Sequence, residues 1–385
     1  QKSKYGVSEN RARLLPQISA VAGYSNNFDP PVSVTDGSSY GVPYNITQTL
    51  QHSANAGLEM QMPLFNQTLY TSMSIAKVVE EISRLSYGKA REDIILQISK
   101  MYYLGQVTAE QIVLIKANIT RLEELRDITR AFFDNGMSME VDLKRVNINL
   151  ENLKVQYDNA QAMMKQQLNM LKYIMDYPAE KEIALTPVNT DSITTVALTG
   201  LSENLYELQL TQSQLELAER QKRMITNGYI PSLSLTGNWR YAAYTDKGYH
   251  WFHSGPSNHW FRSYGLGLTL RIPIFDGLDK TYKIRKAMID IENRKLAWED
   301  TRKNLQTQYL NAVNDLMNNQ RNFKKQKDNY LLAEDVYAVT SDRYREGIAS
   351  MTEVLQDEMQ MSEAQNNYIN AHYNYPVSYT HLTLP

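Results

Sequence analysis

LRIPIFDG at residues 270–277 repeats an earlier stretch of the chain, MQMPLFNQ at residues 60–67. A second pair precedes these two, because GYIPSLSL at 228–235 repeats RLLPQISA at 13–20. The copies lie about 210 residues apart, whereas the unit of a solenoid protein is roughly 20 to 50 residues long. The sequence therefore predicts two large structural repeats of one architecture, joined head to tail.

We assign the two repeats to residues 1–210 and 211–375. In each repeat the paired motifs are followed by a long helical run that a glycine interrupts, and we predict that the chain reverses at tips 134–138 and 345–350. Residues 176–200 contain two prolines and no helical period, which predicts a small irregular segment between the repeats. The first repeat opens within the end of a helix.

Between the motifs of each pair, apolar and polar residues alternate with the two-residue period of a β-strand. Residues 232–241 and 263–272 both follow this pattern. Strands of about ten residues cross a bilayer when tilted, although a half-buried strand of a soluble sheet shows the same alternation. Aromatic residues near one end of the strands favour a membrane β-barrel. The predicted lipid-facing residues are Leu233, Leu235, Trp239, Leu266, Leu268 and Leu270.

Long helices form the rest of the predicted fold. The chain has no proline from Tyr70 to Phe133, and a helix of that length extends roughly 95 Å. Apolar residues recur three and four positions apart, as at Ile112, Ile115 and Ile119, which is typical of a coiled-coil seam. A single hairpin of such polar helices is poorly stabilised, so the pattern indicates an oligomer. The predicted fold class is mostly α with a membrane β-barrel.

Composition excludes several classes of function. The chain has no cysteine, which excludes disulfides and thiolate metal sites, and its net charge of −2 leaves no electrostatic footprint for nucleic acid. No apolar run approaches the roughly 18 residues of a membrane-spanning helix, but barrel strands need no such run. No nucleophile elbow, phosphate loop or paired-carboxylate pocket is recognisable, so we expect neither an enzyme nor a bound cofactor or metal.

The order and duplication of these features resemble the TolC-type outer-membrane efflux proteins, from about Arg11 to Asn374. The resemblance implies a homotrimer whose chains each give four strands to one twelve-stranded barrel in outer-membrane lipid and their helices to a periplasmic α-helical barrel. It also implies two partners, a periplasmic adaptor (membrane fusion protein) and an inner-membrane pump. The expected function is that of the Gram-negative outer-membrane channel of an efflux or type I secretion system.

The resemblance assigns a role to the two tips. Asn135 with Gly136, and Glu346 with Gly347, lie where the family docks against adaptor hairpins. A side chain larger than hydrogen at either glycine is expected to obstruct that contact. The simpler interpretation is that each glycine only allows the left-handed turn at the end of a helix.

The resemblance also implies a periplasmic gate after the second tip. Tyr344 matches a tyrosine that holds the family's helices shut, and Glu353 matches a carboxylate of an inward ring, with Asp357 nearby. Three copies of such a carboxylate around one axis would attract cations. Two positions depart from the family pattern, because Ala349 replaces a basic residue and Gln356 replaces a second carboxylate. The alternative is that Glu353 is an ordinary solvated helix residue.

The end of the sequence follows a different pattern. PVSYTHLTLP at residues 376–385 matches nothing in the first repeat, and we expect the last helix to stop before Pro376 and the tail to be non-native. Two other functions stay open, a periplasmic coiled-coil adaptor and a soluble structural protein. An adaptor has one helical hairpin, and a soluble coiled coil leaves the four alternating strands unexplained.

Overall fold

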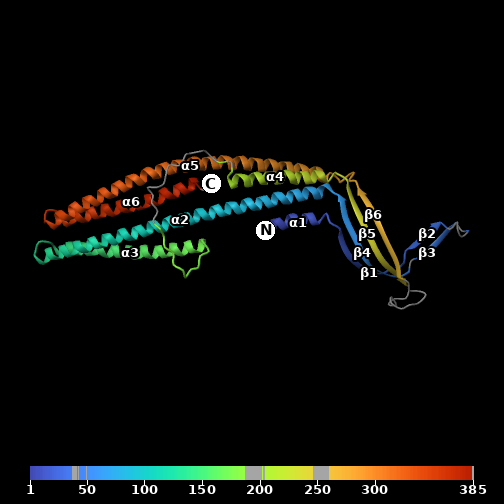
Figure 1. Cartoon of the computed structure of the whole chain (residues 1–385), viewed down its shortest axis with the longest axis horizontal. Helices are drawn as coiled ribbons and strands as arrows, with labels where there is room; N and C mark the ends of the chain where they lie inside the picture. The colour runs from blue at the N-terminus through green and yellow to red at the C-terminus, as the bar shows by residue number, and fades with distance from the viewer. Residues whose placement is uncertain are drawn as a thin grey trace. The chain divides into compact units, whose positions relative to one another are not determined.

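The computed structural model describes residues 1–36, 41, 43–48, 50–186, 202, 204–245 and 260–383 (Figure 1). The first series of elements is α1 (Lys2–Ala12), β1 (Gln17–Asn26), β2 (Val32–Asp36), β3 (Tyr44–Gln48), β4 (His52–Phe65), α2 (Gln67–Asp134) and α3 (Glu140–Ile174). The second series is α4 (Tyr206–Asn227), β5 (Ser232–Thr245), β6 (Trp260–Arg271), α5 (Asp279–Arg345) and α6 (Met351–Thr383). The four long strands and the long helices predicted from periodicity are confirmed. Of the segment predicted at 176–200, residues 187–200 lie outside the described residues.

The chain divides into two compact units. The sheet unit contains Gln1–Leu85 and Leu210–Trp298, and the helical unit contains Ser86–Gln209 and Glu299–Pro385. Because α2, α4 and α5 each contribute residues to both units, each unit takes part of each sequence repeat. The repeats of the sequence and the compact units of the structure therefore do not coincide.

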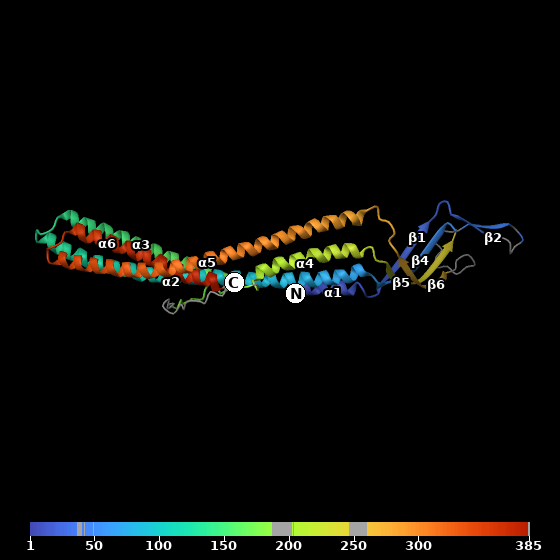
Figure 2. The ribbon, with the colours of Figure 1, turned by 90° about the horizontal axis from the view of Figure 1, so that it is seen from above.

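The sheet unit is built on an antiparallel sheet with the strand order β1-β4-β5-β6 (Figure 2). Its register aligns the apolar residues of all four strands, because Leu58 lies opposite both Ala20 and Trp239. Leu233 and Leu235 in turn lie opposite Leu270 and Leu268. Since side chains alternate between the two sides of a strand, this register gives the sheet one apolar face and one polar face.

The repeated motifs MQMPLFNQ and LRIPIFDG form the junctions from a strand to a long helix. The pairing of β4 with β5 shifts between Pro63 and Phe65, where proline has no backbone N–H to donate. Asn66 then caps α2, because its Oδ1 accepts the backbone N–H groups of Thr68 and Leu69 at 3.0 and 3.2 Å. In the second copy, Asp276 accepts the backbone N–H of Lys280 at 3.2 Å.

The β2–β3 hairpin was not predicted from the sequence. Val32 pairs with Gln48 and Asp36 with Tyr44 in a separate two-stranded sheet between β1 and β4. Every residue of β2 is exposed, so neither face of the strand packs against a core. Apolar and polar residues do alternate in β2, with Val32 and Val34 on one side and Ser33 and Thr35 on the other, but no buried face accompanies this alternation.

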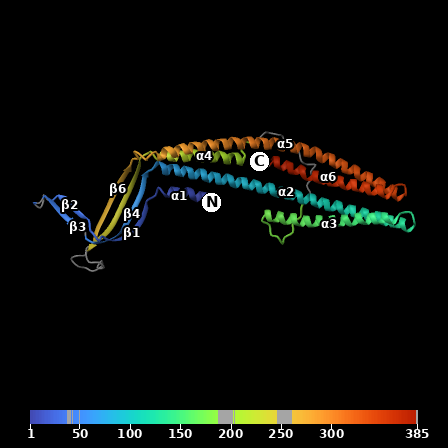
Figure 3. The same cartoon turned by 180° about the vertical axis from the view of Figure 1, so that it is seen from behind.

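In the helical unit, α3 lies beside α2 and α6 beside α5 (Figures 1 and 3). The core combines apolar residues of all four helices: Ile115, Leu122, Leu125, Val146, Leu150, Leu153, Ala160, Tyr337, Tyr344, Met351, Val354, Leu355 and Met361. Ile112 and Ile119 pack against it, so the predicted seam is confirmed. Full burial of each large apolar side chain contributes about 1.5 to 3 kcal/mol.

The prediction that the last helix stops before Pro376 is wrong. α6 continues to Thr383, and the Pro376 side chain is fully buried. Two hydroxyl groups donate to carbonyl oxygens around the proline, from Ser378 to Tyr375 at 2.7 Å and from Thr380 to Val377 at 2.8 Å. Burial in this stretch of α6 outweighs the poor helix propensity of proline. The non-native origin of residues 376–385 stays a prediction.

Candidate functional site

The two predicted tips have the same backbone geometry. Gly136 and Gly347 adopt φ values of +73° and +74°, in the left-handed region that favours glycine. The Gly136 N–H donates to the Phe133 carbonyl at 2.9 Å, and the next N–H, of Met137, reaches back five residues at 2.8 Å. Gly347 and the residue after it make the equivalent two bonds at 2.9 and 2.8 Å. Both helices thus end in a Schellman motif, which accounts for each glycine as a helix terminator.

The surface around the tips is open and partly apolar. A Cβ atom built on Gly136 or Gly347 would meet no other atom within 4 Å. Met137, Met139 and Ile348 next to the glycines are 67%, 70% and 62% exposed. Asn135 donates its side-chain amide to the Ala131 carbonyl at 2.7 Å, whereas Glu346 is exposed. The docking role of the tips stays a prediction.

Tyr344 lies in the core rather than on the surface. Its hydroxyl donates to Thr129 Oγ1 at 3.3 Å, and its ring centroid lies 5.6 Å from that of Phe132. Both contacts join α5 to α2 just before the tips. No hydrogen bond or ion pair in the described part of the helical unit joins Tyr344 to Glu353 or Asp357.

Glu353 has a structural role that the sequence analysis did not assign. Ser350 precedes α6, and its backbone N–H donates to Glu353 Oε2 at 2.8 Å. The Glu353 N–H donates in return to Ser350 Oγ at 3.3 Å, which completes a capping box. The Ser350 N–H also lowers the pKa of Glu353, so its carboxylate is held in the ionised form.

A buried carboxylate follows the predicted gate residues and was missed. Asp357 is half-buried, whereas Glu358 is only 6% exposed. Burial raises the pKa of Glu358, and the charge of Arg121 opposes this effect only in part. The sequence holds a signal for it, because Met351, Val354, Glu358, Met361 and Gln365 are spaced alternately by three and four residues and are all buried.

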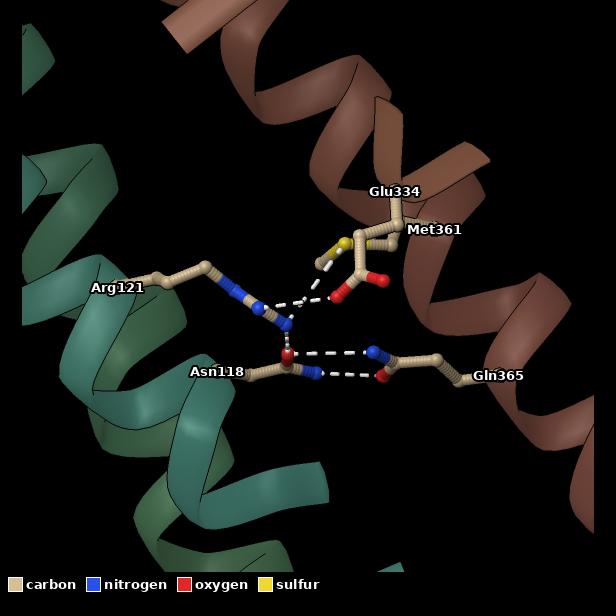
Figure 4. Close-up of polar contacts among 5 residues, drawn as sticks. All are labelled: Asn118, Arg121, Glu334, Met361 and Gln365. Atoms are coloured by element: carbon tan, nitrogen blue, oxygen red, sulfur yellow. Dashed lines mark hydrogen bonds and ion pairs between the residues drawn. The ribbon is translucent and has the colours of Figure 1, made fainter. Parts of the chain in front are cut away.

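A polar layer crosses the apolar seam of the helical unit (Figure 4). Asn118 of α2 and Gln365 of α6 are 2% and 5% exposed, and their amides exchange hydrogen bonds of 2.7 and 3.4 Å. Arg121 donates to Asn118 and also forms an ion pair with Glu334 of α5 at 3.3 Å. The layer therefore links three helices through directional bonds inside a seam that is mostly apolar.

The sheet presents two chemically different faces. We call the side with Leu58, Trp239 and the predicted lipid-facing leucines the apolar face, where Leu266 and Leu268 are 79% and 68% exposed. The opposite, polar face is hollowed and is lined by Gln17, Ser19, Glu59, Gln61, Thr236 and Asn238. Glu59 pairs with Arg240 on this face at 2.8 Å.

The described residues contain no cluster of three or more histidines and carboxylates that could hold a metal ion. No helix within the described ranges is long and apolar enough to cross a membrane.

Comparisons with known proteins agree over most of the chain. A family model described as outer membrane efflux protein matches residues 1–175 and 201–384. The outer membrane protein TolC of Vibrio cholerae is 20% identical over 392 residues, which cover 98% of this chain and 83% of TolC. The probable efflux pump outer membrane protein TtgC of Pseudomonas putida is 24% identical over 363 residues, which cover 88% and 71%. The solved structure of the outer membrane protein VceC from Vibrio cholerae superposes with a TM-score of 0.78 at 14% identity and covers 99% of this chain and 89% of VceC.

Proposed function

Because this chain belongs to the outer membrane efflux protein family, we propose that it is the outer-membrane channel of a tripartite efflux or type I secretion system in a Gram-negative bacterium. The channel receives its substrates from an inner-membrane pump through a periplasmic adaptor and conducts them across the periplasm and the outer membrane. The observation that carries this proposal is the sheet, whose exposed apolar face suits lipid and whose hollowed polar face suits a water-filled lumen.

The sheet also supports a homotrimer. It ends at β1 on one side and at β6 on the other, and an unpaired edge readily pairs with another chain. Because β1 and β6 run in opposite directions, β6 of one copy can pair antiparallel with β1 of the next. Three copies then close a barrel of twelve strands, which removes every edge.

The helical unit carries the proposed contacts with the partners. The open tips at Asn135, Gly136, Glu346 and Gly347 dock against the adaptor, and the exposed methionines beside the first tip add apolar area to this contact. Tyr344 holds α5 against α2 near the closed end. Glu353 and Asp357 of three copies line the constriction and attract cations.

The alternative of a periplasmic adaptor is less well supported, because the chain has two helical hairpins and a four-stranded sheet with an exposed apolar face. Membrane fractionation followed by purification tests the choice. We expect the chain, expressed with a signal peptide, to fractionate with outer membranes and to purify in detergent as a trimer. A protein that is recovered from the periplasm as a monomer without detergent would contradict the proposal.

A further inference from the structure

Charge is distributed unequally between the two faces of the sheet. The four strands contain one acidic residue, Glu59, and three arginines, Arg240, Arg262 and Arg271. Glu59, Arg240 and Arg271 lie on the polar face, whereas Arg262 shares the apolar face with Leu266, Leu268 and Leu270. Arg262 is therefore the only arginine, lysine or carboxylate on the apolar face of these strands.

The surroundings of Arg262 are aromatic. Arg262 lies directly opposite Tyr241 in the sheet, and its guanidinium carbon is 6.0 Å from the centroid of the Tyr264 ring. Trp239 completes this rim cluster, because its ring packs edge-on against Tyr241 at 5.3 Å. Arg262 is exposed and forms no ion pair with any described residue.

The position of Arg262 along the strand decides what it can bind. Eight residues separate it from Leu270, which corresponds to roughly 26 Å along a strand and to about 20 Å of depth at a barrel tilt near 40°. Arg262 thus lies near one rim of an apolar band about 25 Å tall, at the level of the headgroups. A cation is tolerated at this level of a barrel, whereas it is strongly disfavoured at the midplane.

A second copy cannot supply a counterion from its adjacent strand. In the proposed trimer β1 of the next copy pairs with β6, and on the apolar face it carries Ile18, Ala20, Ala22 and Tyr24. None of these residues is acidic. Neither the described residues nor the adjacent strand of a second copy therefore offers Arg262 a counterion, whereas anionic lipid does.

We infer that Arg262 and its rim cluster bind the phosphate of an anionic lipid headgroup on the outer surface of the barrel. The guanidinium donates paired hydrogen bonds to the phosphate oxygens, and the tyrosines and tryptophan pack against the glycerol or sugar and upper acyl region. This inference rests on the proposed function, because it requires that the apolar face contact lipid.

Native mass spectrometry of the detergent-solubilised trimer tests the inference. The probes are phosphorylated lipid A and its dephosphorylated form, titrated against wild type, Arg262→Leu, Arg262→Lys and Arg271→Leu. Arg271→Leu is the matched control, because it removes the same charge from the other face of the same strand. We expect Arg262→Leu to bind phosphorylated lipid A about fivefold more weakly, which corresponds to the roughly 1 kcal/mol of one basic residue at an anionic surface. Arg262→Lys keeps the charge but loses the paired donors, so it should bind more weakly than wild type and more tightly than Arg262→Leu, and Arg271→Leu should match wild type.

Three results would overturn the inference: equal binding by Arg262→Leu and wild type, an equal loss in Arg271→Leu, or full competition by millimolar inorganic phosphate, which would indicate a free-anion site. These results all assume a trimer extracted from membranes. A chain that does not form one would instead contradict the proposed function, and the inference with it.

Discussion

Neighbouring carboxylates on α6 have opposite environments, and the difference follows from which side of the helix each occupies. Glu353 is exposed and accepts the Ser350 N–H, so its pKa is lowered. Glu358 points into the seam, where burial raises its pKa. The resemblance to the family assigned Glu353 as a gate residue. The burial of Glu358 is indicated only by the spacing of three and four residues along α6. The resemblance therefore did not identify Glu358, the buried one of these two carboxylates.

Replacing Glu358 by glutamine should stabilise the protein at neutral pH. A carboxyl whose pKa is raised on folding contributes stability below its ordinary value of 4.5 and loses it as the pH rises through the folded-state value. We therefore expect the melting temperature of Glu358→Gln, followed by circular dichroism in detergent, to exceed that of wild type at pH 7 and to approach it near pH 4.

Glu353→Ala is the contrasting variant, because the pKa of Glu353 is lowered on folding. Its stabilising effect is present above the ordinary value of 4.5 and lost as the pH falls through the folded-state pKa. Glu353→Ala should thus be less stable than wild type at pH 7 and equal to it at low pH. The same pH trend in both variants would show that these environments are assigned wrongly.

The amide pair of Figure 4 should show strong coupling between its members. Asn118→Leu leaves the Gln365 amide buried without its partner, which costs about 1 to 3 kcal/mol. Asn118→Leu combined with Gln365→Leu removes both polar groups and should recover most of that loss. A double-mutant cycle on urea unfolding measures the coupling, and purely additive effects would contradict the importance of the pair.

At the scale of elements, the periodicity of apolar residues predicted the strands and helices that have one face against a core or suited to lipid. β1, β4, β5 and β6 alternate because the sheet has two unlike faces, and α2 repeats at three and four because it packs into a seam. The short strand β2 also alternates, but it was not predicted, and all of its residues are exposed. The predicted end of α6 at Pro376 was wrong. Helix propensity depends on the residue itself, whereas the burial that overrides it at Pro376 depends on contacts with distant residues.

The two faces of β6 should differ in their tolerance of charge. Leu268→Arg places a cation near the middle of the apolar face and should reduce trimer assembly, because that change costs about 2 to 4 kcal/mol per chain. Thr269→Arg, one residue further on, lies on the polar face and should assemble normally. Heat-modifiable migration of outer-membrane trimers on gels measures assembly. Similar assembly of both variants would mean that the assignment of the two faces is wrong.

At the scale of the whole molecule, the sheet and the tips carry separate parts of the proposed function. In that proposal the sheet inserts into the membrane and forms the trimer, whereas the tips contact the adaptor. Changes at the tips should therefore leave assembly intact and affect only transport. The sequence predicted the positions of the sheet and of the tips. The Schellman geometry that the two tips share is visible only in the structure.

Gly136→Leu and Gly347→Leu should form trimers yet abolish efflux, because each adds volume at the proposed contact with the adaptor backbone. Each also strains a left-handed residue by about 1 to 2 kcal/mol. Sensitivity of cells to toxic compounds, compared with trimer content, measures the effect. Asparagine tolerates the left-handed conformation, so Gly347→Asn separates the two causes. Loss of efflux in the asparagine variant supports docking, whereas full efflux there means that the glycine serves only the turn.

The polar layer between α2 and α6 also bears on how such long helices find each other during folding. Apolar seams repeat every seven residues, so a pair of helices that slips by one heptad, roughly 10 Å, still packs apolar residues against apolar residues. The slip would bury the amides of Asn118 and Gln365 without partners, at about 1 to 3 kcal/mol for each. A misaligned α2–α6 pair is then less stable than the aligned one, which is retained. The hydrogen-bonded pair of Asn118 and Gln365 thus specifies the register of the two helices and disfavours registers shifted by one heptad.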